Sequence, residues 1–451
     1  MYKPYIKPIV KAAPDIRVPE PRISKFVLLL LKFLARPYLL TFIGRAKIIL
    51  RGENYLFDAF KRALAKESRC IIAFRHAIGA EPQLLAWFFL FRFNALARKA
   101  GIKFPCRPHA LFIYGYEVAR WGGWVARFFM PRIGAMPIHH TKLDRQGMSR
   151  ILNAIVEGPY PVALAPEGQV SYTAESVPRL EPGTFWIGFN AADRINKQGS
   201  NIPVEVLPLS IYSRFGAKEK STLETLIRKI EAYTNISGKE ARALPLTKRL
   251  ELCREHILEV NENRYEIKSD KNIPFENRLD TVINTALETG ERMLGIKGEG
   301  DFFTRLYYLR QICWDLIILP GVDSLDNMTP AKRSTADLRA GEAWYASRHM
   351  ELADLGWYFR VPLPQESDPL HIKTEYCQNL YDFANRTMGG AFGNRKNILP
   401  QRVIIQAAPV INLTERLPSY KADKRAAMDT AMKDLEKTYL DSIQTVNQEE
   451  I

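Results

Sequence analysis

Short apolar runs alternate with helix-forming stretches between about residue 45 and residue 215 of this chain. The runs are rich in Val, Ile, Leu and aromatic residues, which is typical of buried strands, and the stretches between them repeat their apolar residues at helical spacing. Such alternation predicts an α/β fold. Strands are expected at 70–74, 109–115, 135–138, 161–165 and 204–212, and helices at 82–101, 118–130, 147–157 and 183–196.

Charged, helix-forming segments follow one another after Phe215, and no strand-like run interrupts them convincingly. Strand chemistry returns in RVIIQAAPVINL (402–413), before an amphipathic segment at 421–444. We therefore expect a mixed β-sheet flanked by helices with a large all-helical insertion, and a last strand and helix that rejoin the sheet. No internal repeat is recognised. The insertion is expected to contain helices at about 220–233, 239–262, 274–294, 301–316, 335–355 and 373–388.

Positive charge is concentrated in the first half of the chain. The formal net charge is +15, and residues 1–51 and 92–150 each hold eleven Lys or Arg against two acidic residues. Such stretches predict an anionic partner, either nucleic acid or phospholipid head groups. Because the basic residues are interleaved with long apolar helices and not with a recognisable reader motif, the pattern favours lipid over nucleic acid.

The apolar segment 26–44 is the first candidate for membrane contact. Lys32, Arg36 and Pro37 interrupt it before about 20 apolar residues have accumulated, the length that a simple spanning helix needs. No small-residue cleavage site follows, so a removed signal peptide is not indicated. We expect residues 1–44 to form an interfacial anchor, with an ordinary core helix as the alternative. The aromatic residues around Trp124 predict a second membrane-facing helix, for which core packing is the alternative.

Cysteine and histidine usage limits the other classes of site. The five cysteines are widely spaced, with no CxxC pair and an odd total, so neither a disulfide framework nor a cysteine zinc site is predicted. His139 and His140 lack an HExxH pattern or a Cys partner, so no metal site is expected there. The chain contains no GxSxG elbow, which argues against a serine lipase.

The strongest chemical signal is AFRHAIGAEPQLL (73–85), at the end of a predicted strand and the start of an apolar helix. Pro82 disfavours the helical conformation at Glu81, and Gly79 permits a turn, so Glu81 can fold back onto His76. The carboxylate would fix the imidazole tautomer and leave the other ring nitrogen to take a proton from a hydroxyl, as acyl transfer requires. Alternatively, Glu81 only caps the helix and His76 is a buried histidine.

The second signal is VALAPEGQVSY (162–172), a strand that runs directly into Pro-Glu-Gly. Gly168 allows the backbone to approach a ligand closely, and Glu167 can bond an acceptor hydroxyl or orient nearby cations. In a parallel sheet this turn opens on the same edge as the end of the 70–74 strand, where ligands bind. An ordinary strand-to-turn junction is the alternative interpretation.

In their order these pieces resemble the glycerolipid acyltransferases of the lysophosphatidate acyltransferase type, over about residues 45–212 and 398–445. His76 to Glu81 resembles the first block of that family, a His and an acid separated by four residues. The other similar pieces are RGEN (51–54), GAMPIHH (134–140), Glu167 to Val170, VEVLPLSI (204–211) and APVINL (408–413). The resemblance implies direct acyl transfer with His76 and Glu81 as catalytic residues. It also implies acceptor binding by Arg75, Gly79, Glu167, Gly168 and Gln169.

Three positions depart from the family pattern. Glu81 replaces the usual Asp, and His140 and Val170 stand where the family has arginines associated with the phosphate of the acceptor. A substitute anion site is expected from His139, His140, Lys142 and Arg145. A lyso-lipid without a phosphate, such as a lyso-aminolipid, is the alternative acceptor. His139 and Asp144 repeat the His-x4-acid spacing, but no long apolar helix follows them, so we interpret them as part of a solvated loop.

The resemblance implies a membrane-associated O-acyltransferase of phospholipid biosynthesis on the cytoplasmic face. Its acceptor would be 1-acyl-glycerol-3-phosphate, its thioester donor acyl-CoA or acyl carrier protein, and it would need no metal or redox cofactor. Membrane lipids, and a carrier protein as a candidate donor, are the expected partners; nucleic acid is not. The alternative of another class is a catalytically inactive membrane-binding scaffold. The expected domains are an interfacial segment (1–44), a first acyltransferase part (45–215), a helical insertion (216–397) and a returning strand and helix (398–451).

Overall fold

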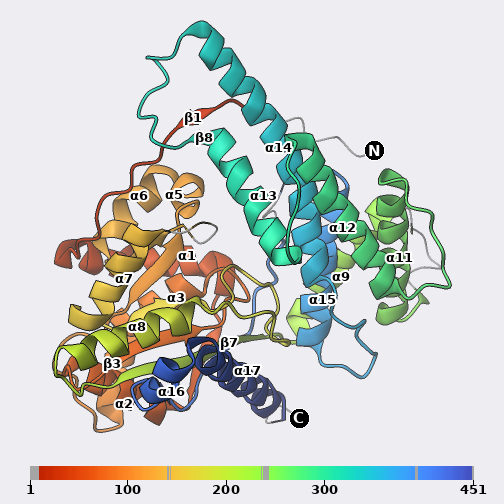
Figure 1. The fold of residues 1–451 in the computed structure, drawn as a ribbon. Coiled ribbons are helices and arrows are strands. Elements are labelled where there is room, and N and C mark those ends of the chain that lie inside the picture. Colours follow the sequence, from red (N-terminus) through yellow and green to blue (C-terminus); the bar gives the residue numbers. More distant parts are fainter. Residues whose placement is uncertain are drawn as a thin grey trace. The chain divides into compact units, whose positions relative to one another are not determined.

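The computed structural model describes residues 10–139, 142, 144–234, 236, 243–391 and 395–448. The chain divides into two compact units (Figure 1). An α/β unit consists of Val18–Gly216 and Leu399–Ile451, and a helical unit consists of Met1–Arg17 and Ala217–Ile398. The segment expected to act as one interfacial piece, 1–44, is therefore shared between the two units.

An eight-stranded mixed sheet forms the centre of the α/β unit, in the order β2-β9-β7-β3-β6-β4-β5, with β10 paired to β7. The run from β7 to β5 is parallel throughout. β9 and β10 are antiparallel to β7, so the C-terminal strand rejoins the sheet as the sequence predicts. β2, which is parallel to β9, is absent from the predicted strands. The strands are Lys47–Arg51 (β2), Arg69–Phe74 (β3), Leu111–Gly115 (β4), Met136–Ile138 (β5), Val162–Leu164 (β6), Val204–Arg214 (β7), Arg402–Ala407 (β9) and Ile411–Asn412 (β10).

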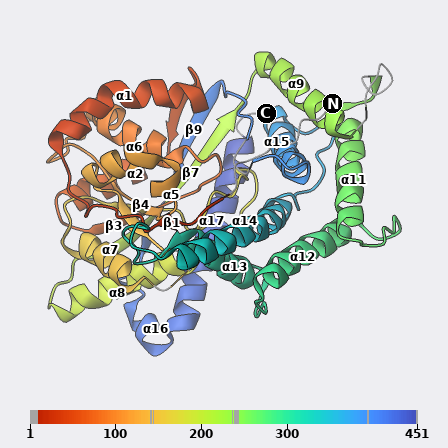
Figure 2. The ribbon, with the colours of Figure 1, turned by 90° about the horizontal axis from the view of Figure 1, so that it is seen from above.

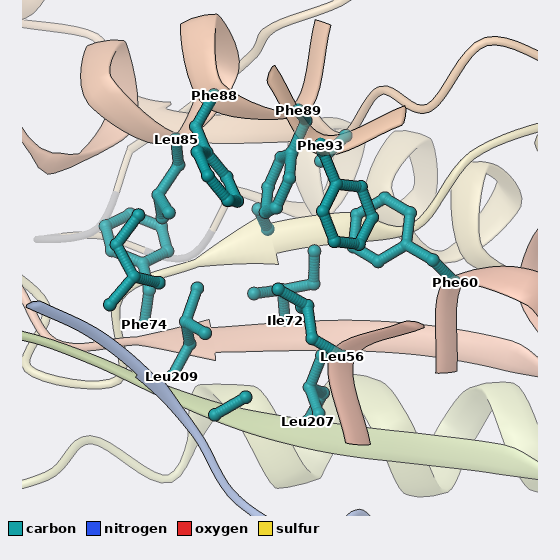
Figure 3. Close-up of a cluster of buried hydrophobic side chains, with 14 of the residues drawn as sticks. Leu56, Phe60, Ile72, Phe74, Leu85, Phe88, Phe89, Phe93, Leu207 and Leu209 are labelled. Atoms are coloured by element: carbon teal, nitrogen blue, oxygen red, sulfur yellow. The ribbon is translucent and has the colours of Figure 1, made fainter. Parts of the chain in front are cut away.

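Helices cover both faces of this sheet, because successive side chains of a strand point to opposite sides. On β3, Ile72 and Phe74 pack into one core with α2, α3 and the π-helical turn η1 (Figure 3), whereas Ile71 and Ala73 pack into another with α7, α8 and α17. The helices of the unit are Lys25–Ile43 (α1), Glu53–Leu64 (α2), Glu81–Phe88 (α3), Phe89–Phe93 (η1), Asn94–Lys99 (α4), Val118–Trp121 (α5), Gly123–Arg132 (α6), Arg145–Glu157 (α7), Gly183–Lys197 (α8), Leu417–Ala422 (α16) and Lys424–Gln448 (α17).

The helix expected at 82–101 begins one residue earlier, at Glu81, and contains the π turn η1. A π turn adds one residue to a helical turn and so shifts which side chains face inward. Phe89 and Phe93 both turn toward the core, with ring centroids 4.7 Å and 4.9 Å from that of Phe60. This aromatic cluster anchors the helix whose first residue is Glu81.

The helical unit is not entirely helical. Ala13–Pro14 (β1) pairs in parallel with Ile318–Leu319 (β8), because the extended N-terminal segment meets the chain where α13 ends. The expectation of an all-helical insertion is corrected in this respect. The described helices of the unit are Ala217–Thr234 (α9), Leu246–Arg264 (α11), Phe275–Leu294 (α12), Phe302–Ile317 (α13), Pro330–Tyr358 (α14) and Leu370–Thr387 (α15).

The helical unit also contains a repeat that the sequence analysis missed. The starts of α11, α12 and α13 read PLTKR (245–249), PFENR (274–278) and DFFTR (301–305), and each arginine bonds carboxylates of an earlier helix, which is α9, α11 and α12 in turn. Figure 2 shows α11, α12 and α13 following one another. Two carboxylates seven residues apart lie on one helix face, so a single guanidinium can reach both. The seven-residue spacing applies to Arg249 with Glu224 and Glu231 and to Arg278 with Glu255 and Glu262, whereas Arg305 pairs with Glu291 at 2.7 Å and with Glu288, three residues earlier, at 3.9 Å.

Candidate active site

His76 and Glu81 are in contact just beyond the C-terminal end of β3, as the sequence predicts. Nδ1 of His76 lies 2.9 Å from Oε2 of Glu81, and Oε1 of Glu81 accepts the backbone N–H of Ile78 at 2.5 Å. The Glu81 side chain is fully buried, whereas that of His76 is 17% exposed. A carboxylate beside Nδ1 favours the tautomer with its proton on that nitrogen. Since no described residue bonds Nε2, the ring is held through one nitrogen and keeps the other for a ligand.

Arg75 and Glu167 form a buried ion pair that also holds the backbone of His76. Nε of Arg75 donates to Oε1 of Glu167, and the N–H of His76 donates to Oε2 at 3.1 Å. Burial acts to lower the pKa of Arg75, but the Glu167 carboxylate outweighs it and the pKa is raised, so the guanidinium stays charged. Because the two side chains are only 1% and 0% exposed, the geometry favours a positioning role over the acceptor contact expected from the sequence.

Arg75 is bonded on a second side as well. Its Nη2 donates to the carbonyls of Thr173 and Ser176, at 2.8 Å and 2.6 Å. Both carbonyls belong to the long loop between β6 and α8. Arg75 therefore joins the end of β3 to this loop at two places, Glu167 and 173–176.

The Pro-Glu-Gly turn lies beside His76 because β6, which precedes it, is a parallel neighbour of β3. The N–H of Ser171 donates to the carbonyl of His76 at 2.8 Å. Gly79 and Gly168 have φ angles of +82° and +72°, which glycine adopts without strain. Gly79, Gly168 and Gln169 are all partly exposed, as acceptor-binding residues have to be.

Backbone N–H groups of the two turns could stabilise an oxyanion, but several of them are already engaged. The N–H of His76 donates to Glu167, that of Ile78 to Glu81, and that of Gly168 to the carbonyl of Ala165 at 3.1 Å. Any oxyanion at this place has to be met by the remaining N–H groups of the two turns.

The expected anion site does not adjoin His76 along the sheet. His139 follows β5, which is three strand spacings from β3, or about 14 Å. The ring of His139 stacks on Tyr116 with centroids 4.1 Å apart. Asp144 caps α7 by accepting the N–H of Gly147 at 2.8 Å and also accepts the backbone N–H of His139 at 3.1 Å. Lys142 and Arg145 are exposed, and His140 lies outside the described residues.

An exposed apolar surface lies on α1 and α6. The helix α1 continues through Pro37, and within the described ranges it is the one helix long and apolar enough to cross a membrane, a test that core helices and signal sequences also pass. The N–H of Ser24, at the start of α1, donates to the carbonyl of Arg132 at the end of α6 at 2.8 Å, which ties the two helices together. The exposed large apolar side chains are Phe26, Leu29, Phe33, Leu34, Tyr38 and Leu40 on α1 and Trp124, Val125 and Phe128 on α6.

The residue that sequence reasoning missed is Tyr439 of α17. It is fully buried, its OH donates to the carbonyl of Ala73 at 2.9 Å, and its ring lies 5.4 Å from the guanidinium carbon of Arg75. Nothing in the sequence around position 439 distinguishes it from other apolar positions of an amphipathic helix. The predicted return of the C-terminal segment to the sheet indicates only that some residues of this helix lie close to the strands.

Comparison of the chain with protein-family models, with curated proteins and with solved structures gives no match. Among the residues that the structure describes, no group of three His, Cys, Asp or Glu is placed to hold a metal ion.

Proposed function

We propose that this protein is an acyltransferase of the lysophosphatidate acyltransferase type, which moves a fatty acyl group from acyl-CoA or acyl carrier protein to the hydroxyl of 1-acyl-glycerol-3-phosphate. The observation that carries the proposal is the contact between His76 and Glu81 where a parallel strand ends. A histidine held through Nδ1 by a buried carboxylate fits the role of a general base toward an alcohol. The mixed sheet flanked by helices is compatible with this family's fold.

In the proposed reaction, Nε2 of His76 takes the proton of the acceptor hydroxyl while that oxygen attacks the thioester carbonyl. The new C–O bond gives a tetrahedral intermediate, which collapses as the C–S bond breaks. The proton on Nε2 then passes to the leaving thiolate, so no covalent enzyme intermediate forms. Glu81 stabilises the imidazolium that exists between the two proton transfers.

The apolar surface on α1 and α6 supports action at a membrane. Phe26, Phe33 and Trp124 are 73%, 67% and 70% exposed, and Lys25 and Lys32 accompany them on α1. Aromatic side chains that enter the acyl layer beside lysines that reach lipid phosphates are typical of interfacial helices. The lyso-lipid and its acylated product both reside in that layer.

A lyso-lipid without a phosphate is the second candidate acceptor. It is favoured by the place of the anion site predicted from the sequence, which follows β5, three strands from β3 and His76. Val170, which stands in place of a family arginine, also contributes no charge beside the Pro-Glu-Gly turn.

The test is turnover of purified protein on vesicles that contain a panel of lyso-acceptors with and without phosphate, using labelled acyl-CoA and acyl carrier protein. We expect His76→Ala to lower kcat by about 10²–10⁴-fold while the protein stays folded. His256→Ala, in the helical unit, is the matched control and is expected to keep wild-type activity. Near-normal turnover by His76→Ala would exclude the mechanism, and no product from any acceptor would favour the inactive scaffold.

A further inference from the structure

The C-terminal helix α17 contacts the candidate active site from the far end of the chain. Tyr439, Ser442 and Asn447 lie along the face of α17 that packs on the sheet and on the loop after β6. None of them reacts in the proposed mechanism. Each, however, bonds a segment that holds His76 or Arg75 in place.

Tyr439 makes the most direct of these contacts. Its OH donates to the carbonyl of Ala73, three residues before His76, and its ring faces the Arg75 guanidinium. Arg75 in turn bonds Glu167, whose other oxygen accepts the N–H of His76. A continuous set of contacts therefore runs from α17 to the backbone of His76.

The other two residues fix the surroundings of Arg75. The OH of Tyr212, on β7, donates to Oγ of Ser442 at 2.9 Å. Asn447 accepts from Arg214 at 2.7 Å and donates to Glu175 at 3.0 Å, and Arg214 also bonds Glu175 at 2.8 Å. Glu175 lies between Thr173 and Ser176, the two residues whose carbonyls accept from Arg75. Thus α17 holds both the strand beside β3 and the loop that Arg75 bonds.

We propose that Tyr439 is a positioning residue of the His76 site, which sets the place of the imidazole through the carbonyl of Ala73 and the guanidinium of Arg75. The proposal rests on the proposed function for its kinetic consequence. Its structural part, the dependence of the His76–Glu81 contact on α17, holds for any chemistry at this site. Since a displacement of about 1 Å can lower a rate by about 10²-fold, loss of this anchor is expected to lower kcat and leave KM for both substrates nearly unchanged.

The test compares Tyr439→Leu, which removes the OH and the ring, with Tyr439→Phe, which keeps the ring. The matched control is Tyr420→Leu, another buried tyrosine of the same unit, whose ring stacks on Phe189 with centroids 4.4 Å apart. Histidine ring NMR signals of full-length, ¹⁵N-labelled protein report the Nδ1–H of His76, assigned with His76→Gln. We expect the chemical shift of this signal to change, or the signal to broaden, in Tyr439→Leu. The change should be smaller in Tyr439→Phe, and the signal should be unchanged in Tyr420→Leu.

The kinetic measurement is made on the same variants. We expect kcat to fall by about 10²-fold in Tyr439→Leu and by less in Tyr439→Phe, with KM within about twofold, whereas Tyr420→Leu keeps wild-type values. An unchanged His76 signal and unchanged kcat in both Tyr439 variants would overturn the proposal. If the leucine variant does not fold, the phenylalanine variant alone decides. Absence of acyl transfer in the wild type would overturn the proposed function, while the NMR signal would still test the role of Tyr439.

Discussion

Replacement of Glu81 by Gln is the change whose result the geometry determines most closely. One oxygen of Glu81 accepts the backbone N–H of Ile78, and the other faces Nδ1 of His76. The glutamine carbonyl is expected to accept the N–H of Ile78, because an NH₂ group in that position would leave this partly buried N–H without an acceptor, at a cost of about 1–3 kcal/mol. The NH₂ group therefore faces Nδ1.

The consequence is a reversed tautomer at His76. Nδ1 now accepts a hydrogen bond, so the single proton of the neutral ring moves to Nε2, the nitrogen that has to receive the proton of the acceptor hydroxyl. We expect kcat to fall by about 10³–10⁴-fold, as for wrong-tautomer variants of other histidine–carboxylate pairs. The shape and volume of the side chain are unchanged, so the fold is expected to be retained.

The assay is steady-state acyl transfer on vesicles, together with a thermal unfolding curve. Glu205→Gln is the matched control: Glu205 is a buried carboxylate of β7 that bonds Arg62 at 3.0 Å, away from the site. Its variant is expected to lose little activity. A folded Glu81→Gln protein with kcat within about tenfold of wild type would refute the assignment of His76 as base and Glu81 as its orienting partner.

Three further changes test other parts of the structure. Arg75→Met leaves a buried carboxylate without its partner and is expected to destabilise the α/β unit by about 3–5 kcal/mol, which calorimetry would show as a Tm lower by about 10 °C. Phe33→Asp removes an exposed aromatic ring from α1 and is expected to weaken sedimentation with anionic vesicles by about tenfold. Hydrogen bonds from Arg249 lower the pKa of Glu224, so this pair stabilises the helical unit at neutral pH and the stabilisation is lost as the pH falls through that lowered pKa. In denaturant titrations, Arg249→Met is expected to show a smaller difference in unfolding free energy between neutral and acid pH.

Much of the α/β unit was predictable because its strands carry strong local signals. The run at 70–74 is apolar throughout and the run at 204–212 is apolar except at Glu205 and Ser210, as is typical of strands buried on both faces, and both are strands of the sheet. β2 was missed because it lies on the edge of the sheet and its residues are only partly buried, so its apolar pattern is weak. The contact of His76 with Glu81 was predictable because it is local and is governed by Gly79 and Pro82.

Contacts between distant segments were not predictable in the same way. Glu167 was expected near His76. Its bonds to Arg75 and to the His76 backbone, however, depend on the register of β3 and β6, which cannot be read from the local sequence pattern of either strand. Tyr439 contacts Ala73 across a separation of 366 residues in the chain, which includes the segment Ala217–Ile398. The repeated arginines of the helical unit could not be recognised from apolar periodicity, because that pattern contains no information on which charged residues pair.

The pairing of β7 with β9 has a consequence for how the size of this protein can vary. Arg214 and Arg402 are opposite each other in this antiparallel pair, and the N–H of Gln401 donates to the carbonyl of Arg214 at 2.8 Å. In terms of connectivity, all of Ala217–Ile398 thus occupies the place of the loop in a β-hairpin. Hairpin loops can change greatly in length at small entropic cost, since the strand ends stay paired. A change in the length of that segment is therefore expected to leave β3, the strand that precedes His76, in place.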